Sequence, residues 1–290
     1  FIVYRLTGEF TQDRSQGYGL QCYDIQKGEW DLSMCSRMGI DPQKLPKLFD
    51  CHEIVGTVTA RASEETGLLE GVPVAAGGLD AACGTLGAGV IRDGETQEQG
   101  GQAGGMSICM ESFHSDPRLI LSHHVVPGTW LLQGGSVGGG GVMRWISQEL
   151  GAAARMQAEK NGTSQLYELD REAEMVSPGA DGVVFLPYMA GERSPIWNPR
   201  AKGVFFGLDY SKTRGHMIRA AMEGVGFSLR HNLQVAEEAG VRVSQLRAQG
   251  GAANSRLWTQ MKADITGKEI LVPGSDTAGA LGAAILAGVG

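Results

Sequence analysis

A run of glycines and alanines around one carboxylate limits most strongly how this chain can fold. Asp80 stands within residues 77–89, most of which are too small to fill a core, and it follows the apolar stretch 72–76. That order predicts a buried strand, a glycine turn and then Asp80 just beyond the strand end. Because glycine accepts positive φ and lets the backbone approach a ligand, the segment suits a binding pocket. A glycine turn leading into a helix of small residues explains it equally well.

Glycine is abundant throughout the chain, at 44 of 290 residues, roughly twice its usual share of about 7%. Three further glycine loops, at 99–105, 133–141 and 250–251, stand beside expected strand ends or helix starts. Main-chain N–H groups at such points bind phosphate well. The loop at 133–141 runs into an expected helix at Val142, so free N–H groups there could face an anion. These loops favour nucleotide phosphate binding.

Composition and missing motifs exclude several classes of protein. The net charge of −7 argues against a nucleic-acid partner, and no apolar stretch is long enough to cross a membrane. Five cysteines without C-x-x-C spacing indicate reduced thiols and hence a cytoplasmic protein. The P-loop, dinucleotide, nucleophile-elbow and zinc-protease motifs are all missing. No residue is therefore assigned as a metal ligand, and the pair His123 and His124 is interpreted as a loop feature.

The strands expected in the second half of the chain follow from short apolar runs. Residues 183–187 predict a buried strand, residues 203–208 a second one with close backbone packing, and residues 246–248 a third that leads into a glycine turn. In residues 1–70, by contrast, prolines and glycines break any long periodic element. We expect mainly short helices there.

Three helices are expected in the same half. The first runs from the N-cap Thr213 to Gly240, because apolar residues recur at every fourth position between them. A second helix, capped by Asn254, ends before Gly267. Residues 279–288 predict a third helix, whose small residues allow it to pack close to a neighbour.

Motifs in this second half carry a family resemblance. The sequence Gly-Val-Phe-Phe-Gly-Leu at 203–208 is followed, after seven residues, by His-Met-Ile-Arg-Ala-Ala-Met-Glu at 216–223. Together they match the C-terminal signature of the FGGY carbohydrate kinases at every constrained position. Segments 187–195, 250–260 and 279–284 resemble the same family. The similarity covers essentially the whole chain, including its opening.

The resemblance implies an α/β protein with the actin-like, ribonuclease H-like fold of a two-domain sugar kinase. Residues 1–92 would complete the N-terminal domain, and residues 93–290 would form most of the C-terminal, ATP-binding domain. The chain begins at Phe1 without methionine and stops at Gly290 inside a helix-forming run. We therefore expect a truncated chain that lacks most of the N-terminal domain and the C-terminal end. Such a fragment would be inactive alone, because the upstream phosphate loop is missing.

Asp80 receives a chemical role from the resemblance. In this family, an Asp so placed is the general base that accepts the proton of the sugar hydroxyl as it attacks ATP. Phosphoryl transfer needs one carboxylate beside the nucleophile, with amides and Mg²⁺ around the phosphates. The resemblance thus implies ATP-dependent phosphorylation of a sugar with ATP and Mg²⁺ as cofactors. A homodimer is compatible with it.

The sugar itself is less well defined by the sequence. The similarity looks closest to xylulokinase-like members, which favours a pentulose such as xylulose. Ala81 stands where glycerol kinases have Gln and many xylulokinases have Asn. A direct hydroxyl contact at this position is therefore not expected.

The resemblance also assigns residues to ATP. Relatives show Gly-Thr-Ser or Gly-Thr-Gly on the second phosphate loop, whereas residues 101–104 are Gly-Gln-Ala-Gly. The hydroxyl is missing, although a Gln amide can still donate to a phosphate oxygen. A tight turn would demand these glycines equally. The positions implied at the phosphate loop, the pocket wall and the adenine end are, in that order, Gly101 and Gln102, Gly140 and Arg144, and Gly251 and Ser255.

Two other functions remain open. A sugar- or nucleotide-binding regulator of the same fold, without catalysis, is motivated by Gln102 and Ala103 in place of the usual hydroxyl residues. An actin-like ATPase would instead hydrolyse ATP without needing sugar. Glu192 and Arg193 are interpreted as a buried ion pair that shapes the domain, because such pairs are more often structural than catalytic.

Overall fold

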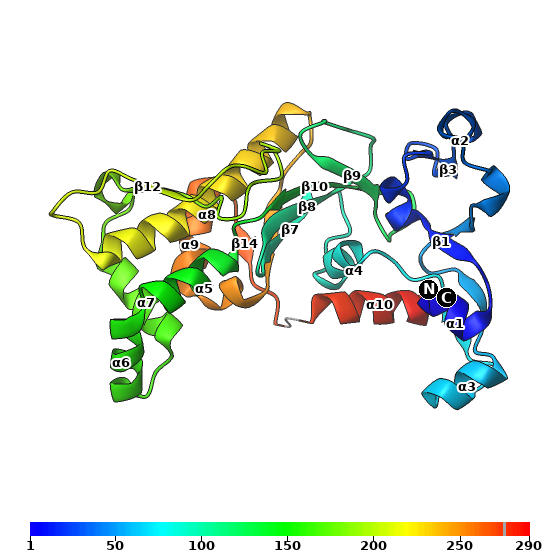
Figure 1. The fold of residues 1–290 in the computed structure, drawn as a ribbon, viewed down its shortest axis with the longest axis horizontal. Helices are drawn as coiled ribbons and strands as arrows, with labels where there is room; N and C mark the ends of the chain where they lie inside the picture. The colour runs from blue at the N-terminus through cyan, green and yellow to red at the C-terminus, as the bar shows by residue number, and fades with distance from the viewer. Residues whose placement is uncertain (275–276) are drawn as a thin grey trace.

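A six-stranded sheet organises the fold (Figure 1). The structure is a computed structural model that describes residues 1–274 and 277–290. The strands nearest to one edge pair in parallel and the remaining pairs are antiparallel. In order across the sheet they are β14 (Ile270–Leu271), β13 (Gln245–Gln249), β7 (Glu95–Gly100), β8 (Gly104–Met110), β10 (Trp130–Ser136) and β9 (Ile120–His123).

Alternation of side chains along the strands gives this sheet two apolar faces. Ile108 of β8 points to one face, where it packs with residues of the long helix α8 (Arg214–Glu238). The next residue, Cys109, points to the other face and packs with residues of helix α4 (Asp80–Gly87). The sheet therefore lies between α8 and the helix that begins with Asp80.

Helix α8 confirms the prediction made from apolar residues at every fourth position. It begins after the N-cap Thr213, and Gly240, with φ of 84°, follows its end. Ala221 and Leu233 on this stripe are completely buried. Packing of this stripe against the sheet, more than local propensity, stabilises so long a helix.

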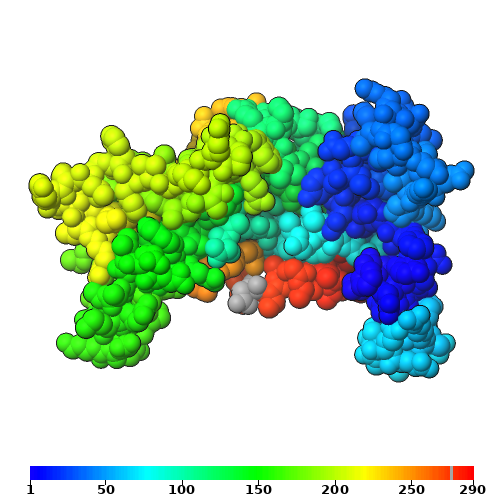
Figure 2. All heavy atoms as spheres, viewed as in Figure 1, coloured from blue at the N-terminus to red at the C-terminus, as the bar shows by residue number. Residues whose placement is uncertain are grey.

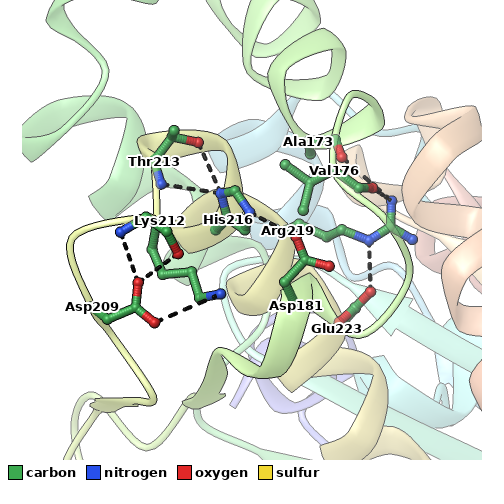
Figure 3. A network of polar contacts seen from close by, with 10 residues as sticks. Ala173, Val176, Asp181, Asp209, Lys212, Thr213, His216, Arg219 and Glu223 are labelled. Carbon is green, nitrogen blue, oxygen red and sulfur yellow. Dashed lines mark hydrogen bonds and ion pairs between the residues drawn. The ribbon is translucent and has the colours of Figure 1, made fainter.

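Polar side chains at the start of α8 tie the helix to the segment before it (Figure 3). His216 Nε2 lies 3.0 Å from Asp181 Oδ2, and Arg219 Nε donates to Glu223 Oε1 at 2.8 Å. Arg219 also donates to the carbonyl oxygen of Val176 at 2.8 Å. Because Arg219 and Glu223 are buried, these bonds satisfy charges that would otherwise be costly. The polar residues of the signature at 216–223 therefore anchor the start of α8.

The helix of small residues predicted at 279–288 is α10 (Ala278–Val289), and it packs against α4. A Cβ atom on Gly282 would lie 1.9 Å from the carbonyl oxygen of Cys83, and one on Gly87 would lie 1.9 Å from that of Ala278. Glycine is thus required at both positions, and the predicted close packing is confirmed. Figure 2 shows α10 along the floor of a broad concave side of the molecule.

Residues 1–75 form short helices and paired strands outside the central sheet. The predicted short helices are confirmed, but the strand pairs between them were not predicted, because strands of two to four residues carry too little alternation. The helices are α1 (Ile2–Thr7), α2 (Leu32–Met38) and α3 (Ala60–Thr66), and the strand pairs are β1 (Thr11–Asp13) with β4 (Lys47–Phe49), β2 (Tyr23–Asp24) with β3 (Glu29–Trp30), and β5 (Ile54–Thr57) with β6 (Pro73–Ala75).

Several predictions about strands need correction. The strand expected at 72–76 is β6, but it is half-buried rather than buried. The run at 183–187 forms β11 (Val184–Leu186), which in the described ranges pairs with β12 (Val204–Phe206) alone, so Val184 and Leu186 are exposed while Phe185 is buried. Close packing next to β12 is confirmed, because a Cβ on Gly207 would lie 2.4 Å from a carbonyl oxygen. A two-stranded ribbon covers only one of its faces, which a run of apolar letters does not reveal.

The remaining helices surround the other end of the sheet. The cap of α9 is Ser255, whose side chain accepts from the N–H of Trp258 at 3.1 Å, so the prediction of Asn254 as the cap is wrong by one residue. No helix in the described ranges is both long and apolar enough to cross a membrane. These helices are α5 (Gly140–Glu149), α6 (Ala152–Asn161), α7 (Gln165–Glu174) and α9 (Arg256–Thr266).

His124 joins the end of α4 to the β9–β10 connection. It is 4% exposed, its Nδ1 accepts from the N–H of Val125 at 2.8 Å, and its Nε2 lies 2.9 Å from the carbonyl oxygen of Val90. Because Nδ1 accepts, the proton must be on Nε2 and the ring is neutral. Burial lowers the pKa of His124 to about 4. The ring is therefore structural, although its neighbour His123 ends strand β9 and is not in a loop.

We expect this buried ring to make the fold sensitive to acid. Since the pKa of His124 is about 4 in the folded chain and 6.5 for a histidine in its ordinary state, the unfolded chain binds more protons between these pH values. The contribution of His124 to the free energy of unfolding is thus fully present above pH 6.5. It is lost as the pH drops towards 4, by on the order of 3 kcal/mol. Unfolding free energies at pH 7.5 and pH 4.5 check this. His124→Gln should show a smaller loss than the wild type, and the control His231→Gln, at an exposed position, should show the wild-type loss.

Candidate active site

A cavity of about 710 Å³ opens beside the end of β7, within the range of small-molecule sites. Its walls come from the loop after β7, from α5, from the start of α7, from α8 and from the segment 251–258. All six residues predicted to contact ATP line this one cavity: Gly101, Gln102, Gly140, Arg144, Gly251 and Ser255. The structure brings them together, and their ligand stays a prediction.

Two of the glycine loops are bonded directly to each other. The N–H of Gly140 donates to the carbonyl of Gly101 at 2.7 Å, and that of Gly141 donates to the carbonyl of Gln102 at 3.0 Å. The expectation that free N–H groups at the start of α5 face an anion is therefore wrong for these two. The loop at 133–141 is also shorter than predicted, because Gln133 to Ser136 belong to β10.

The glycines in the cavity wall differ in whether packing of the fold requires a residue without a side chain. A Cβ on Gly140 would lie 2.7 Å from the carbonyl oxygen of Gly101, so loop-to-loop packing explains that glycine. A Cβ on Gly101 would make only an ordinary contact, at 3.7 Å, and one on Gly251 would meet no atom within 4 Å. Neither Gly101 nor Gly251 has a positive φ. At these two positions the fold itself tolerates a side chain, and the open space belongs to the cavity.

Charged groups of opposite sign stand on the cavity wall. Arg144 on α5 is exposed and has no hydrogen-bond or ion-pair partner in the described part of the chain. Asp170 on α7 also lines the cavity, where burial raises its pKa and a hydrogen bond from Ser255 partly opposes that rise. An unpaired guanidinium in a cavity is suited to phosphate or carboxylate oxygens.

The carboxylate of Glu192 holds the loop between β10 and α5. It accepts from Ser136 Oγ at 2.8 Å, from the N–H of Val137 at 2.8 Å and from the N–H of Arg193 at 2.7 Å. The predicted buried ion pair is wrong, since no ion pair joins Glu192 and Arg193 among the described residues; Arg193 is exposed and its guanidinium lies against Gly135. Glu192 thus supports the cavity by fixing the loop that leads into α5.

Asp80 lies outside this cavity, at the first position of α4. Its side chain is exposed, and its Oδ1 accepts from the N–H of Ala81 at 2.7 Å. Gly77 before it has a φ of 78°, which explains one of the framing glycines as a turn. The glycine turn and the helix predicted for 77–89 are confirmed, while the catalytic role of Asp80 stays a prediction.

Sequence reasoning missed most of the opposite wall. Ser164 accepts from the N–H of Tyr167 at 3.2 Å and so caps α7, a signal that was present in the sequence. Met222 stands in the signature at 216–223 and Trp258 in the segment 250–260, but the resemblance assigned neither side chain to a ligand. The wall residues missed are Met143, Ser147, Ser164, Leu166, Tyr167, Asp170, Met222, Ala252, Asn254 and Trp258, together with Gly100.

The described residues do not form a metal site by themselves. In residues 1–274 and 277–290, no group of three or more His, Cys, Asp and Glu side chains could hold a metal ion. Mg²⁺ therefore stays a prediction, and we assign no residue and no step to it. All five cysteines are buried and unpaired.

Models of two protein domains match the chain. The model of the C-terminal domain of the FGGY family of carbohydrate kinases matches residues 104–290, and that of the N-terminal domain of the same family matches residues 1–87. The chain belongs to the FGGY family of carbohydrate kinases. The resemblance identified from the signature motifs is confirmed. The domain boundary after residue 92 stays a prediction.

The FGGY chain is similar to known sugar kinases along its length. It is 32% identical to a xylulose kinase of Escherichia coli (strain K12) over 290 residues, which are 99% of this chain and 57% of the relative. It is 33% identical to a gluconokinase of Bacillus subtilis (strain 168) over 288 residues, 99% of this chain and 56% of the relative. A solved xylulose kinase from Rhodospirillum rubrum superposes with a TM-score of 0.89 at 33% identity, over 99% of this chain and 57% of that one.

These similarities confirm the fold prediction. The neighbours are sugar kinases of the FGGY type with the actin-like fold, and the α/β arrangement of this chain matches theirs. The chain spans a little more than half the length of the relatives.

Proposed function

We propose that the full-length protein transfers the γ-phosphoryl group of ATP to a hydroxyl group of a sugar. The observation that carries this proposal is the cavity lined by all six predicted ATP positions. Within it, Gly101 and Gly251 have no structural need to be glycine, which is expected where a ligand approaches the backbone. The free guanidinium of Arg144 supports an anionic ligand there.

Asp80 is proposed as the general base. The sugar oxygen attacks the γ-phosphorus, a new O–P bond forms, and the bond from phosphorus to the β-phosphate oxygen breaks. The proton of the attacking hydroxyl passes to the Asp80 carboxylate, and ADP and a sugar phosphate leave. Exposure of Asp80 on α4 supports this role, because a base must reach a hydroxyl that arrives from solvent.

The proposed substrate is a pentulose such as xylulose. Xylulose kinases are prominent among the relatives, at 32% and 30% identity, but a gluconokinase is as similar, at 33%. Gluconate is a six-carbon acid with a carboxylate and xylulose an uncharged five-carbon ketose, so assays with each compound distinguish the two substrates.

A panel of sugars tests the proposal. The full-length protein is incubated with ATP and with xylulose, ribulose, gluconate or glycerol, and ADP release is followed. Strong stimulation by xylulose is expected. Stimulation by gluconate alone would identify gluconate, and not xylulose, as the substrate. ADP release without any sugar would favour the ATPase. Binding of sugar or ATP without turnover would favour the non-catalytic regulator.

A side chain at Gly251 should block the nucleotide without harming the fold. We expect Gly251→Val to raise the Kd for ATP about tenfold or more, since the added methyl groups would enter the cavity. Isothermal titration measures the Kd, and thermal unfolding should be unchanged. The matched control is Gly19→Val, where a Cβ also meets no atom within 4 Å. If both variants bind ATP with the same Kd, the proposal that this cavity binds the nucleotide is contradicted.

A further inference from the structure

We propose that Ser15, held by Asp13, is a positioning residue for Asp80. The two residues fix the backbone from which the carboxylate of Asp80 projects, although they lie more than sixty positions earlier in the chain. This inference rests on the proposed role of Asp80 as the general base.

The central contact joins Ser15 to the residue before Asp80. The N–H of Leu79 donates to Ser15 Oγ at 2.8 Å, and Ser15 Oγ in turn donates to Asp13 Oδ1. A serine hydroxyl has one proton, and since that proton goes to Asp13, the lone pairs of Oγ face Leu79. Ser15 is completely buried, so water does not compete for either bond.

Asp13 is itself fixed in place. Its Oδ1 also accepts from the N–H of Gln16 at 3.1 Å and receives the Cys51 thiol at 3.8 Å. Burial raises the pKa of Asp13, while the hydrogen bonds from Ser15 and Gln16 oppose that rise. The carboxylate thus takes the proton of the serine hydroxyl, and the oxygen is left to act as an acceptor for the N–H of Leu79.

The rest of the loop is held by packing and by backbone bonds. A Cβ on Gly78 would lie 2.6 Å from Val125 Cγ1 and 3.3 Å from Cys51 Sγ, so this residue is clamped between neighbours. The N–H of Gly77 donates to the carbonyl of Cys51 at 3.0 Å. At the residue directly before Asp80, the backbone N–H of Leu79 donates to the Ser15 side chain and to no other group in the described ranges.

Asp80 depends on this backbone because it has little else to orient it. Leu79, the N-cap of α4, makes no side-chain cap bond, and within residues 1–274 and 277–290 the carboxylate of Asp80 has one hydrogen bond, from the N–H of Ala81. A shift of Leu79 would therefore move the carboxylate directly. Displacements of about 1 Å at a reacting group cost on the order of 10²-fold in rate.

Ser15→Ala in the full-length protein tests this inference. We expect kcat for sugar phosphorylation to fall about 10- to 100-fold, with the KM for ATP within about twofold of the wild type, because the ATP cavity is built from other segments. Ser15→Thr keeps the hydroxyl and should restore most of kcat. The matched control is Ser122→Ala, since Ser122 is equally buried and its Oγ has no partner in the described ranges.

The outcomes separate this inference from the proposed function. Equal kcat for Ser15→Ala and Ser122→Ala would overturn the positioning role, and so would a parallel loss of ATP binding in Ser15→Ala, which would indicate a general structural role. If Asp80→Asn retains activity, the general base itself is wrong. Should Ser15→Ala fail to fold, Ser15→Cys, of similar volume and with a weaker acceptor, gives the same comparison.

Discussion

Asp80→Asn is expected to lower kcat for sugar phosphorylation by about 10²- to 10⁴-fold, the usual contribution of a general base. Asn has the same shape and can still accept from the N–H of Ala81, so α4 should begin as it does in the wild type. Nucleotide affinity should be unchanged, because Asp80 lies outside the cavity that holds the six predicted ATP positions. Coupled measurement of ADP release, together with titration of ATP, checks both expectations.

A matched exchange of carboxylate for amide makes the Asp80 result interpretable. Asp41 caps a short helix through its side chain and lies outside the cavity. Because Asn caps as well as Asp, Asp41→Asn should retain wild-type kcat and stability. Retention of more than half of the wild-type kcat by Asp80→Asn would contradict the role of Asp80 as base.

Local patterns in the sequence predicted the elements that decide the fold. The stripe of α8 and the small residues of α10 are both visible as spacing, and both are confirmed. The burial of β11 could not be predicted, because it depends on which other strand lies beside it. In a two-stranded ribbon half of the apolar side chains stay exposed, whatever their sequence pattern.

The candidate cavity was also predicted only in part, because the sequence shows local motifs but not the contacts between distant segments. The six ATP positions came from motifs within short segments, and the structure places them on one cavity. The bonds from the N–H groups at Gly140 and Gly141 to the other glycine loop were not predictable, since glycine is expected equally in a loop that binds a ligand and in one that packs on another loop. Contacts between residues far apart in sequence leave no local pattern.

The ion pair between Lys262 and Glu98 is the clearest contact of that kind. Lys262 Nζ on α9 donates to Glu98 Oε1 on β7 at 2.6 Å, and the two side chains are 2% and 4% exposed. The ammonium also lies 4.8 Å from the centre of the Trp258 ring, and Trp258 lines the candidate ATP cavity. Two residues after Glu98, β7 ends at Gly100, where the loop predicted to contact the phosphates of ATP begins. The pair therefore joins the two walls of the cavity through the interior.

Removing one partner of this pair is expected to destabilise the protein strongly. Lys262→Met keeps the length of the side chain but leaves the Glu98 carboxylate buried without its cation, so we expect the free energy of unfolding to fall by about 3–5 kcal/mol. The control Lys268→Met breaks a partly exposed pair with Glu237, at 2.8 Å, and should cost at most about 1 kcal/mol. Urea unfolding measures both.

A double variant identifies the origin of that loss. If the cost in Lys262→Met comes from the unpaired carboxylate, adding Glu98→Leu should recover most of it, because apolar pairs of similar volume often replace buried ion pairs without loss of stability. Stability that remains low in the double variant would instead attribute the effect to lost packing around Trp258. If packing around Trp258 is lost, ATP affinity should fall together with stability, because Trp258 then shifts in the wall of the cavity while the loop after β7 stays in place. If the unpaired carboxylate causes the loss, ATP affinity should not change.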